Sequence, residues 1–147
     1  MLRRAMLFIF LVSLAGTAVA SCSSAPSASS DHELKMAPMS MIPEAVQTAA
    51  TVTQQAYQFA IANPEVMQHI PCYCGCGSMG HTSSYSCYVK NVDGKGDVTF
   101  DSHAIGCSIC VDITQDTMRL TKQGESPQEI KAYVDKTYSR FGPSNMQ

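Results

Sequence analysis

Apolar residues recur at helical spacing over three stretches of the chain, residues 43–61, 107–120 and 126–138. The first stretch opens with a proline followed by a glutamate, and the third opens with the capping-box sequence Ser-Pro-Gln-Glu. Both openings are typical of helix N-termini. Gly124 fits the C-terminal cap of the second stretch. These patterns predict three helices, with a turn between the last two.

The region between the first two helices has a different pattern. A short helix is expected from Pro64 to about His69, because Pro71 cannot continue it. Residues 86–92 and 97–100 have strand-like patterns on either side of Asp93-Gly94-Lys95-Gly96, which predicts a hairpin. The expected fold is a small single α+β domain of about four helices, one of them short, with a β-hairpin and a Cys/His-rich loop.

The first residues have the layout of an export signal. A short positive region precedes an uncharged, mostly apolar run over residues 5–20, which is too short for a comfortable membrane span. Val19-Ala20-Ser21-Cys22 then resembles the lipobox of bacterial lipoproteins, in which the cysteine is lipidated and becomes the first residue. We therefore expect residues 1–21 to be a lipoprotein signal peptide and Cys22 to carry a covalent lipid. The alternative is an ordinary cleaved signal with an incidental cysteine.

Residues 22–42 are rich in Ser, Ala and Pro and lack periodicity, so a flexible tether is expected there, followed by the folded domain at 43–147. Removal of the signal leaves 8 basic against 12 acidic residues, from 10 and 12 in the whole chain. No cluster of Lys or Arg remains, so nucleic acid is not an expected partner. Membrane attachment is expected through the lipid alone, at the outer face of the cytoplasmic membrane or at the outer membrane.

Six cysteines remain besides Cys22, and two histidines stand near them in the sequence. In chain order the eight are Cys72, Cys74, Cys76, His81, Cys87, His103, Cys107 and Cys110. Thiols separated by a single residue close disulfides poorly, whereas a soft metal accepts them as they stand. Eight ligands are the number for two tetrahedral sites or for one shared cluster. We interpret the set as ligands of a thiophilic metal, copper or zinc.

Cys107 and Cys110 lie three residues apart at the expected start of a helix. Both sulfurs then face one side, near free backbone N–H groups that favour thiolates. This spacing is also compatible with a thiol–disulfide oxidoreductase using Cys107-Ser108-Ile109-Cys110. A disulfide-stapled surface module is a third hypothesis, since the cysteines are even in number and the chain is expected to be exported. No catalytic residue is assigned, because the sequence lacks the motifs of hydrolases and kinases.

The expected tether contains further soft ligands, which make an auxiliary metal site an additional hypothesis. They are His32, Met36, Met39 and Met41. Their spacing resembles the thioether-rich segments of exported copper-handling proteins, and ordinary linker composition explains it equally well.

The hexapeptide Pro71-Cys72-Tyr73-Cys74-Gly75-Cys76 is the most specific motif of the chain. Together with Gly80-His81, Cys87 and the His103…Cys110 element, it resembles the bacterial lipoprotein family named after the PCYCGC motif, over roughly residues 55 to 141. The resemblance implies bacterial origin, a lipid anchor and one small domain, but no activity. We therefore expect a lipoprotein that sequesters or delivers copper or zinc, with an exported metalloprotein or a metal transporter as partner.

Overall fold

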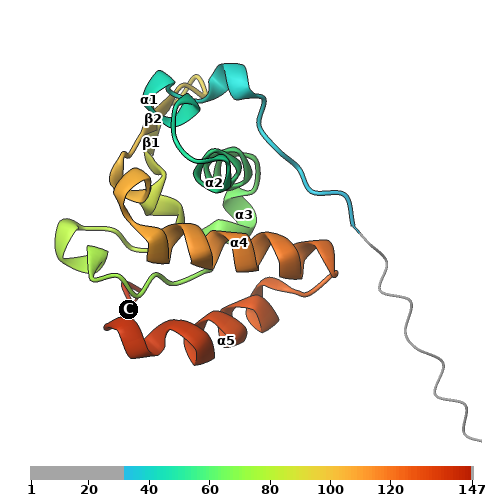
Figure 1. Ribbon diagram of the computed structural model, residues 1–147, viewed down its shortest axis with the longest axis vertical. Coiled ribbons are helices and arrows are strands. Elements are labelled where there is room, and N and C mark those ends of the chain that lie inside the picture. Colours follow the sequence, from blue (N-terminus) through green and yellow to red (C-terminus); the bar gives the residue numbers. More distant parts are fainter. Residues whose placement is uncertain (1–31, 147) are drawn as a thin grey trace, which may run out of the picture.

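Three long helices frame the computed structural model, which describes residues 32–146. They are α2 (Thr51–Ala62), α4 (Ser108–Lys122) and α5 (Pro127–Tyr138). In Figure 1, α4 runs through the middle of the domain, α2 lies above it and is seen almost end-on, and α5 lies below it. The predicted signal peptide, lipobox and Cys22 lie outside the described residues.

Shorter elements complete the domain. Two four-residue helices, α1 (Glu44–Gln47) and α3 (Pro64–Met67), flank α2, and an antiparallel hairpin consists of β1 (Val89–Val92) and β2 (Val98–Phe100). Five short 3-10 turns are η1 (Met39–Met41), η2 (Cys76–Met79), η3 (Tyr85–Cys87), η4 (His103–Gly106) and η5 (Ser139–Phe141). Residues 32–146 thus confirm a small mixed domain with a hairpin and a Cys/His-rich region, with five α-helices where about four were expected.

The expected first helix is interrupted near its start. Ala50 is extended, with ψ at 145°, and separates α1 from α2. The side-chain amide of Gln54 donates hydrogen bonds to the carbonyls of Gln47 (2.7 Å) and Ala49 (2.9 Å), which are the groups that a helix end leaves without partners. The interruption is therefore stabilised by a side chain on the following helix, which the apolar pattern does not register.

The first strand also begins later than expected. Cys87 lies in η3, and its N–H donates to the Ser84 carbonyl at 3.1 Å, so it belongs to a turn and not to the hairpin. Tyr88 is fully buried, and its hydroxyl group lies 2.8 Å from the Cys110 carbonyl, to which it donates, and 2.7 Å from Thr114 Oγ1. Anchoring Tyr88 on α4 turns the chain here and brings Cys87 beside the start of that helix.

The core lies where α2 and α5 pack against opposite sides of α4. Tyr57 of α2 contacts Tyr88 edge to face, with ring centroids 4.9 Å apart, and Ile113 of α4 is fully buried. On the other side of α4, Ile130 and Val134 of α5 are buried. The α5 helix begins with the predicted capping box, in which Ser126 and Glu129 bond each other's backbone N–H groups. The position of α4, and with it of Cys110, is therefore fixed from two sides.

Residues 32–42, expected to be the end of the tether, lie against this core. The His32 N–H donates to the Lys122 carbonyl (2.8 Å), and Ala37 exchanges two hydrogen bonds with Gln58, at 3.0 and 2.7 Å. Ile42 is buried. An extended segment that docks mainly through its backbone shows no apolar periodicity, which is why its sequence resembles a linker.

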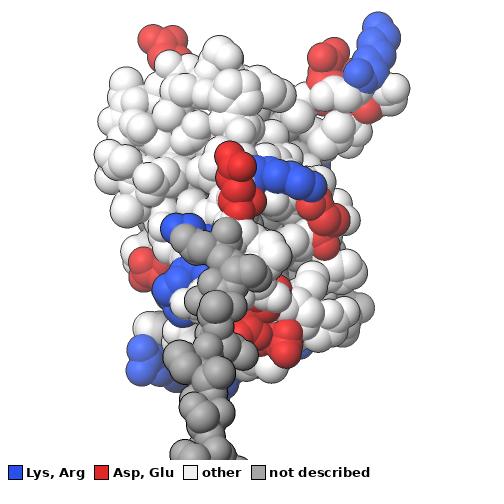
Figure 2. Space-filling view, turned by 90° about the vertical axis from the view of Figure 1, so that its right-hand side faces the viewer, with Lys and Arg blue, Asp and Glu red and all other residues white. Residues whose placement is uncertain are grey.

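The surface shown in Figure 2 carries acidic and basic side chains in mixed order. Several form local ion pairs, such as Lys131 with Asp135 (2.6 Å) and Lys35 with Glu65 (3.4 Å). Within residues 32–146, no helix combines the length and the apolar character needed to cross a membrane.

Candidate metal centre

The cysteine-rich loop is closed at its base by hydrogen bonds between its two ends. Ser84 donates its N–H to the Ile70 carbonyl (2.7 Å) and its hydroxyl to the Pro71 carbonyl (2.9 Å). Inside the loop, Gly75 and Gly80 flank η2 with φ of 87° and 88°. Residues with a Cβ rarely adopt this left-handed backbone, so the glycines allow the tight wrapping that turns the thiols inward.

The C-terminal segment holds the same loop from the other side. Asn145 is buried; its Oδ1 accepts the Cys72 N–H at 2.7 Å and its own N–H donates to the Cys72 carbonyl at 3.0 Å. Its Nδ2 also lies 3.6 Å from Cys76 Sγ, as a donor. Asn145 was not anticipated from the sequence, because nothing local marks a residue that acts 73 positions away.

All eight predicted ligands come together in the structure. They form four overlapping groups whose ligand atoms lie within 4.8 Å of one another: Cys74, His103, Cys107 and Cys110; Cys76, His81, Cys87 and His103; Cys72, Cys74 and Cys76; and Cys72, Cys87 and Cys110. The ligands come from the loop, from η3 and η4, and from the first turn of α4. These described residues are therefore positioned to bind a metal ion.

The sulfur spacings suit coordination. Cys72 Sγ lies 3.4 Å from Cys74 Sγ and 3.5 Å from Cys110 Sγ. Cys110 and Cys107 are 3.1 Å apart, measured between their sulfurs. No disulfide joins the six described cysteines. In a tetrahedral site with metal–sulfur bonds of about 2.3 Å, sulfurs are about 3.8 Å apart. Small movements of these side chains would therefore suffice to surround an ion.

The thiols of the cluster shift one another's pKa in opposite directions. Hydrogen bonds with Cys110 and Cys87 lower the pKa of Cys72 far below its ordinary value, and a hydrogen bond with Cys87 lowers the pKa of Cys76 to about 6. The pKa of Cys87 is raised by its hydrogen bond with Cys110, and that of Cys110 by its hydrogen bond with Cys72. Burial, followed by the charge of Cys72, raises the pKa of Cys74. A bound cation would lower the pKa of each thiol that it contacts.

His81 carries the clearest sign of a missing partner. Its ring is buried, its Nε2 lies 3.4 Å from Asp101 Oδ2, and its Nδ1 is buried without a hydrogen-bond partner among the described residues. A buried polar atom of this kind is costly, and a metal bond would satisfy it. Asp101 also accepts the His103 N–H at 2.8 Å, so one carboxylate orients both histidine segments. The spacing of two residues between Asp101 and His103 could have indicated the bond to the His103 N–H from the sequence, but not the approach to His81.

His103 completes one of the four-ligand groups. Its Nε2 lies 3.3 Å from Cys74 Sγ, and its ring meets that of His81 edge to face, with centroids 5.1 Å apart. His103 is the first residue of η4. This turn is followed directly by Cys107, whose N–H donates to the Ala104 carbonyl, and then by α4. The half-site predicted from His103, Cys107 and Cys110 is therefore assembled by consecutive turns, with Cys74 added from the loop.

The auxiliary residues of the tether lie elsewhere. His32 lies beside Gly124, past the C-terminal end of α4, whereas Cys107 stands at its N-terminal end. Met36 and Met41 are exposed, and Met39 packs partly against the core. His32 belongs to none of the four groups that the clustered cysteines and histidines form.

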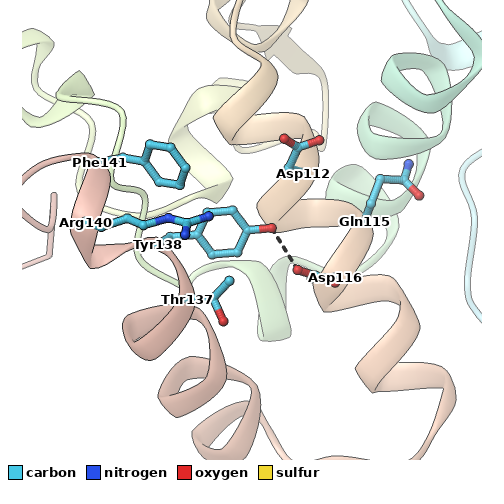
Figure 3. Close-up of a pocket in the computed structure, with 7 residues that line it drawn as sticks. All are labelled: Asp112, Gln115, Asp116, Thr137, Tyr138, Arg140 and Phe141. Atoms are coloured by element: carbon cyan, nitrogen blue, oxygen red, sulfur yellow. Dashed lines mark hydrogen bonds between the residues drawn. The ribbon is translucent and has the colours of Figure 1, made fainter.

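A second surface feature lies between α4 and the end of α5. This groove is lined by Asp112, Gln115, Asp116, Thr137, Tyr138, Arg140 and Phe141. Figure 3 shows Tyr138 pointing at Asp116, to which its hydroxyl donates a hydrogen bond at 2.8 Å. Asp116 also pairs with Arg119 at 2.8 Å. None of the eight clustered ligands lines this groove, so it is separate from the candidate centre.

The comparison with protein families bears directly on the loop. Residues 6–144 match the family described as protein of unknown function with PCYCGC motif. The chain belongs to this family. No curated protein and no solved structure matches it. The PCYCGC family therefore supplies a motif without an assigned chemistry, and the motif's role must follow from its geometry in this chain.

The non-cysteine residues of the PCYCGC motif place its thiols. Tyr73 points away from the sulfurs, since its hydroxyl donates to Asp135 on α5 at 2.6 Å. Pro71 provides the carbonyl that closes the loop with Ser84, and Gly75 supplies the left-handed turn after Cys74. The alternation of cysteine with other residues thus directs three thiols to one side while fastening the backbone on the other.

Proposed function

We propose that this protein is a lipid-anchored, extracytoplasmic binder of a thiophilic metal, Cu(I) or Zn(II), which it sequesters or delivers at the cell envelope. The observation that carries the proposal is the convergence of six thiols and two imidazoles in one centre. Thiolate-rich sites with some imidazole favour Cu(I) and Zn(II) over harder cations. The orphaned His81 Nδ1 also supports a cation at this place.

A thiol–disulfide oxidoreductase is the second candidate, because Cys107 and Cys110 lie 3.1 Å apart at the start of α4. One feature counts against it. The two thiols do not stand as an isolated pair, because Cys74 and His103 lie with them in one four-ligand group and Cys110 Sγ is also 3.5 Å from Cys72 Sγ.

The test of the proposal is metal loading. Protein is purified in the form in which it accumulates in the cell, then reduced, stripped of metal and reloaded with Zn(II) or Cu(I) under anaerobic conditions. After dialysis, it should retain the metal. Loading should release protons, because thiols must lose their protons to bind a metal and the pKa values of Cys74, Cys87 and Cys110 are raised in the cluster. For the same reason, retention should weaken as the pH falls below neutrality. The readouts are elemental analysis, a pH indicator and a free-thiol count.

The histidines provide the matched variants. Replacing both His81 and His103 by alanine should lower the retained metal without changing the free-thiol count of the denatured protein. His69, which is exposed and lies just before the loop, is the control, and its replacement should change neither. Three intact disulfides and no metal in the native protein would overturn the proposal in favour of a stapled surface module. Abundant mixed disulfides trapped by a Cys110 variant would favour the oxidoreductase.

The anchor makes an independent prediction. Since Val19 to Cys22 resembles a lipobox, Cys22→Ala should prevent lipid attachment and move the protein from the membrane fraction to the soluble fraction. Incorporation of labelled palmitate and detergent partitioning measure the effect, with Ser23→Ala in the following polar tract as a control of sequence context. An unlabelled native protein with a free N-terminal residue would contradict the anchor and leave the metal centre unaffected.

A further inference from the structure

Eight ligands exceed the needs of one ion. Zn(II) and Cu(I) take four ligands or fewer in thiolate-rich protein sites, so a centre with six thiols and two imidazoles has the capacity for two ions. The structure also indicates how the ligands divide. Cys74, His103, Cys107 and Cys110 form one complete four-ligand group of three sulfurs and one nitrogen.

The remaining ligands form the second group. Cys76, Cys87 and His81 lie together, with the sulfurs of Cys76 and Cys87 3.7 Å apart. His103 also approaches this group, but its Nε2 is already 3.3 Å from Cys74 Sγ. Cys72 is the available fourth ligand, because its sulfur lies within 4.8 Å of both Cys76 and Cys87. Cys72 also lies 3.5 Å from Cys110, so its thiolate stands at the boundary between the groups.

The two groups differ in their access to solvent. In the first, Cys74, His103 and Cys107 are only half-buried, and Cys110 alone is fully buried. In the second, Cys72, Cys76, Cys87 and His81 are all buried. Cys107 also lines a surface groove with the exposed side chains of Val52 and Ile105, so an incoming molecule can reach the first group at Cys107.

We propose that the protein holds two metal ions that exchange at unequal rates. The outer ion is passed to acceptors and is bound by Cys74, His103, Cys107 and Cys110. The inner ion is retained and is bound by Cys72, Cys76, Cys87 and His81. This rests on the proposed metal-binding function and divides it into a cargo position and a structural position. Transfer of the outer ion is a ligand exchange. A thiolate or imidazole of the acceptor would bond to the ion as the Cys107 bond breaks, and the remaining bonds to Cys74, His103 and Cys110 would then be exchanged for acceptor ligands in the same way. Each released thiolate would take up a proton from water, and the metal would keep its oxidation state.

Zinc provides the probe. The cell-purified protein, stripped and reloaded with Zn(II) under anaerobic conditions, should carry two ions by native mass spectrometry. On addition of the chromogenic chelator 4-(2-pyridylazo)resorcinol, one equivalent should leave quickly and the second about tenfold more slowly or slower still, because its ligands must first open locally. The absorbance time course therefore gives both the stoichiometry and the rates.

Single substitutions assign the fast and the slow release of Zn(II) to the two groups of ligands. Cys107→Ser should remove the fast equivalent and leave one slow ion, whereas Ser108→Ala, an exposed neighbour on the same helix, should keep both phases. If circular dichroism shows that Cys107→Ser does not fold, Cys74→Ser replaces it. This substitution removes another half-buried ligand of the outer ion and should also remove the fast equivalent.

Each result separates this inference from the function on which it rests. Failure of the native protein to bind any Zn(II) or Cu(I) would overturn both. Binding of a single ion, release of two ions at one rate, or loss of both or neither equivalent in Cys107→Ser would overturn the two-position arrangement while leaving a metal-binding function in place.

Discussion

Cys72→Ser is expected to abolish stable binding of the inner ion and to lower the thermal unfolding midpoint of the metal-loaded protein by about 10 °C or more. Cys72 is fully buried and belongs to two of the four ligand groups, so it contacts both halves of the centre. A serine hydroxyl is a poor ligand for a soft metal, and the buried site offers it no equivalent partner. Metal content and the unfolding midpoint measure the effect.

The comparison with Cys107→Ser makes this prediction specific. That substitution removes a half-buried ligand of one group, so it should cost one ion and less stability than Cys72→Ser. The two variants should differ more in the metal-loaded proteins than in the metal-free ones, because the metal-free form loses only the packing of one buried thiol and not a bond to the ion. Retention of two ions with an unchanged midpoint in Cys72→Ser would show that this thiol is a core residue and not a metal ligand.

Asn145→Ala is expected to weaken metal retention about 10- to 100-fold, the range typical of residues that orient ligands. The substitution leaves the buried Cys72 N–H without its acceptor and removes the donor beside Cys76 Sγ. The cost to the stability of the metal-free protein should be about 1–3 kcal/mol, the usual penalty for a buried group left unsatisfied. Competition with a chelator of known affinity measures the first effect, and urea unfolding the second.

Ser144→Ala provides the control for Asn145, since Ser144 is the exposed neighbour of Asn145 and its hydroxyl accepts a hydrogen bond from the Met146 N–H at 3.1 Å. It should leave retention and stability within experimental error of the native values. If Asn145→Ala behaves in the same way, the C-terminal segment merely covers the loop and does not orient the ligands.

The sequence predicted well which cysteines and histidines come together, because the motifs that mark them are local. The three thiols of the PCYCGC hexapeptide and the His103, Cys107, Cys110 element are each close in sequence, and the helix start at Ser108 brings the last two together. The three main helical stretches and the capping box at Ser126 were also predicted from periodicity and termination signals. Mixed α+β architecture with one hairpin followed from the same signals.

What the sequence did not predict depends on contacts between distant parts of the chain. Asn145 binds Cys72 although it lies 73 residues further along the chain, and Asp101 approaches His81 from the end of the hairpin. Cys87 was expected in a strand, but burial of Tyr88 against α4 places it in a turn. Apolar periodicity reports which face of an element is buried, but it does not report a side-chain amide that binds a backbone group 73 residues away.

The way the chain enters the domain bears on the orientation of the protein at a membrane. The His32 N–H binds the Lys122 carbonyl at the C-terminal end of α4, and the candidate centre lies at the other end of this 15-residue helix, about 22 Å away. Nine residues lie between Cys22 and His32, and the ten Cα–Cα steps limit their span to about 35 Å. With a lipid on Cys22, the anchor would therefore join the domain at the end of α4 opposite the metal. A donor or acceptor could then approach the Cys107 opening at the end of the domain that carries no attachment to the anchor.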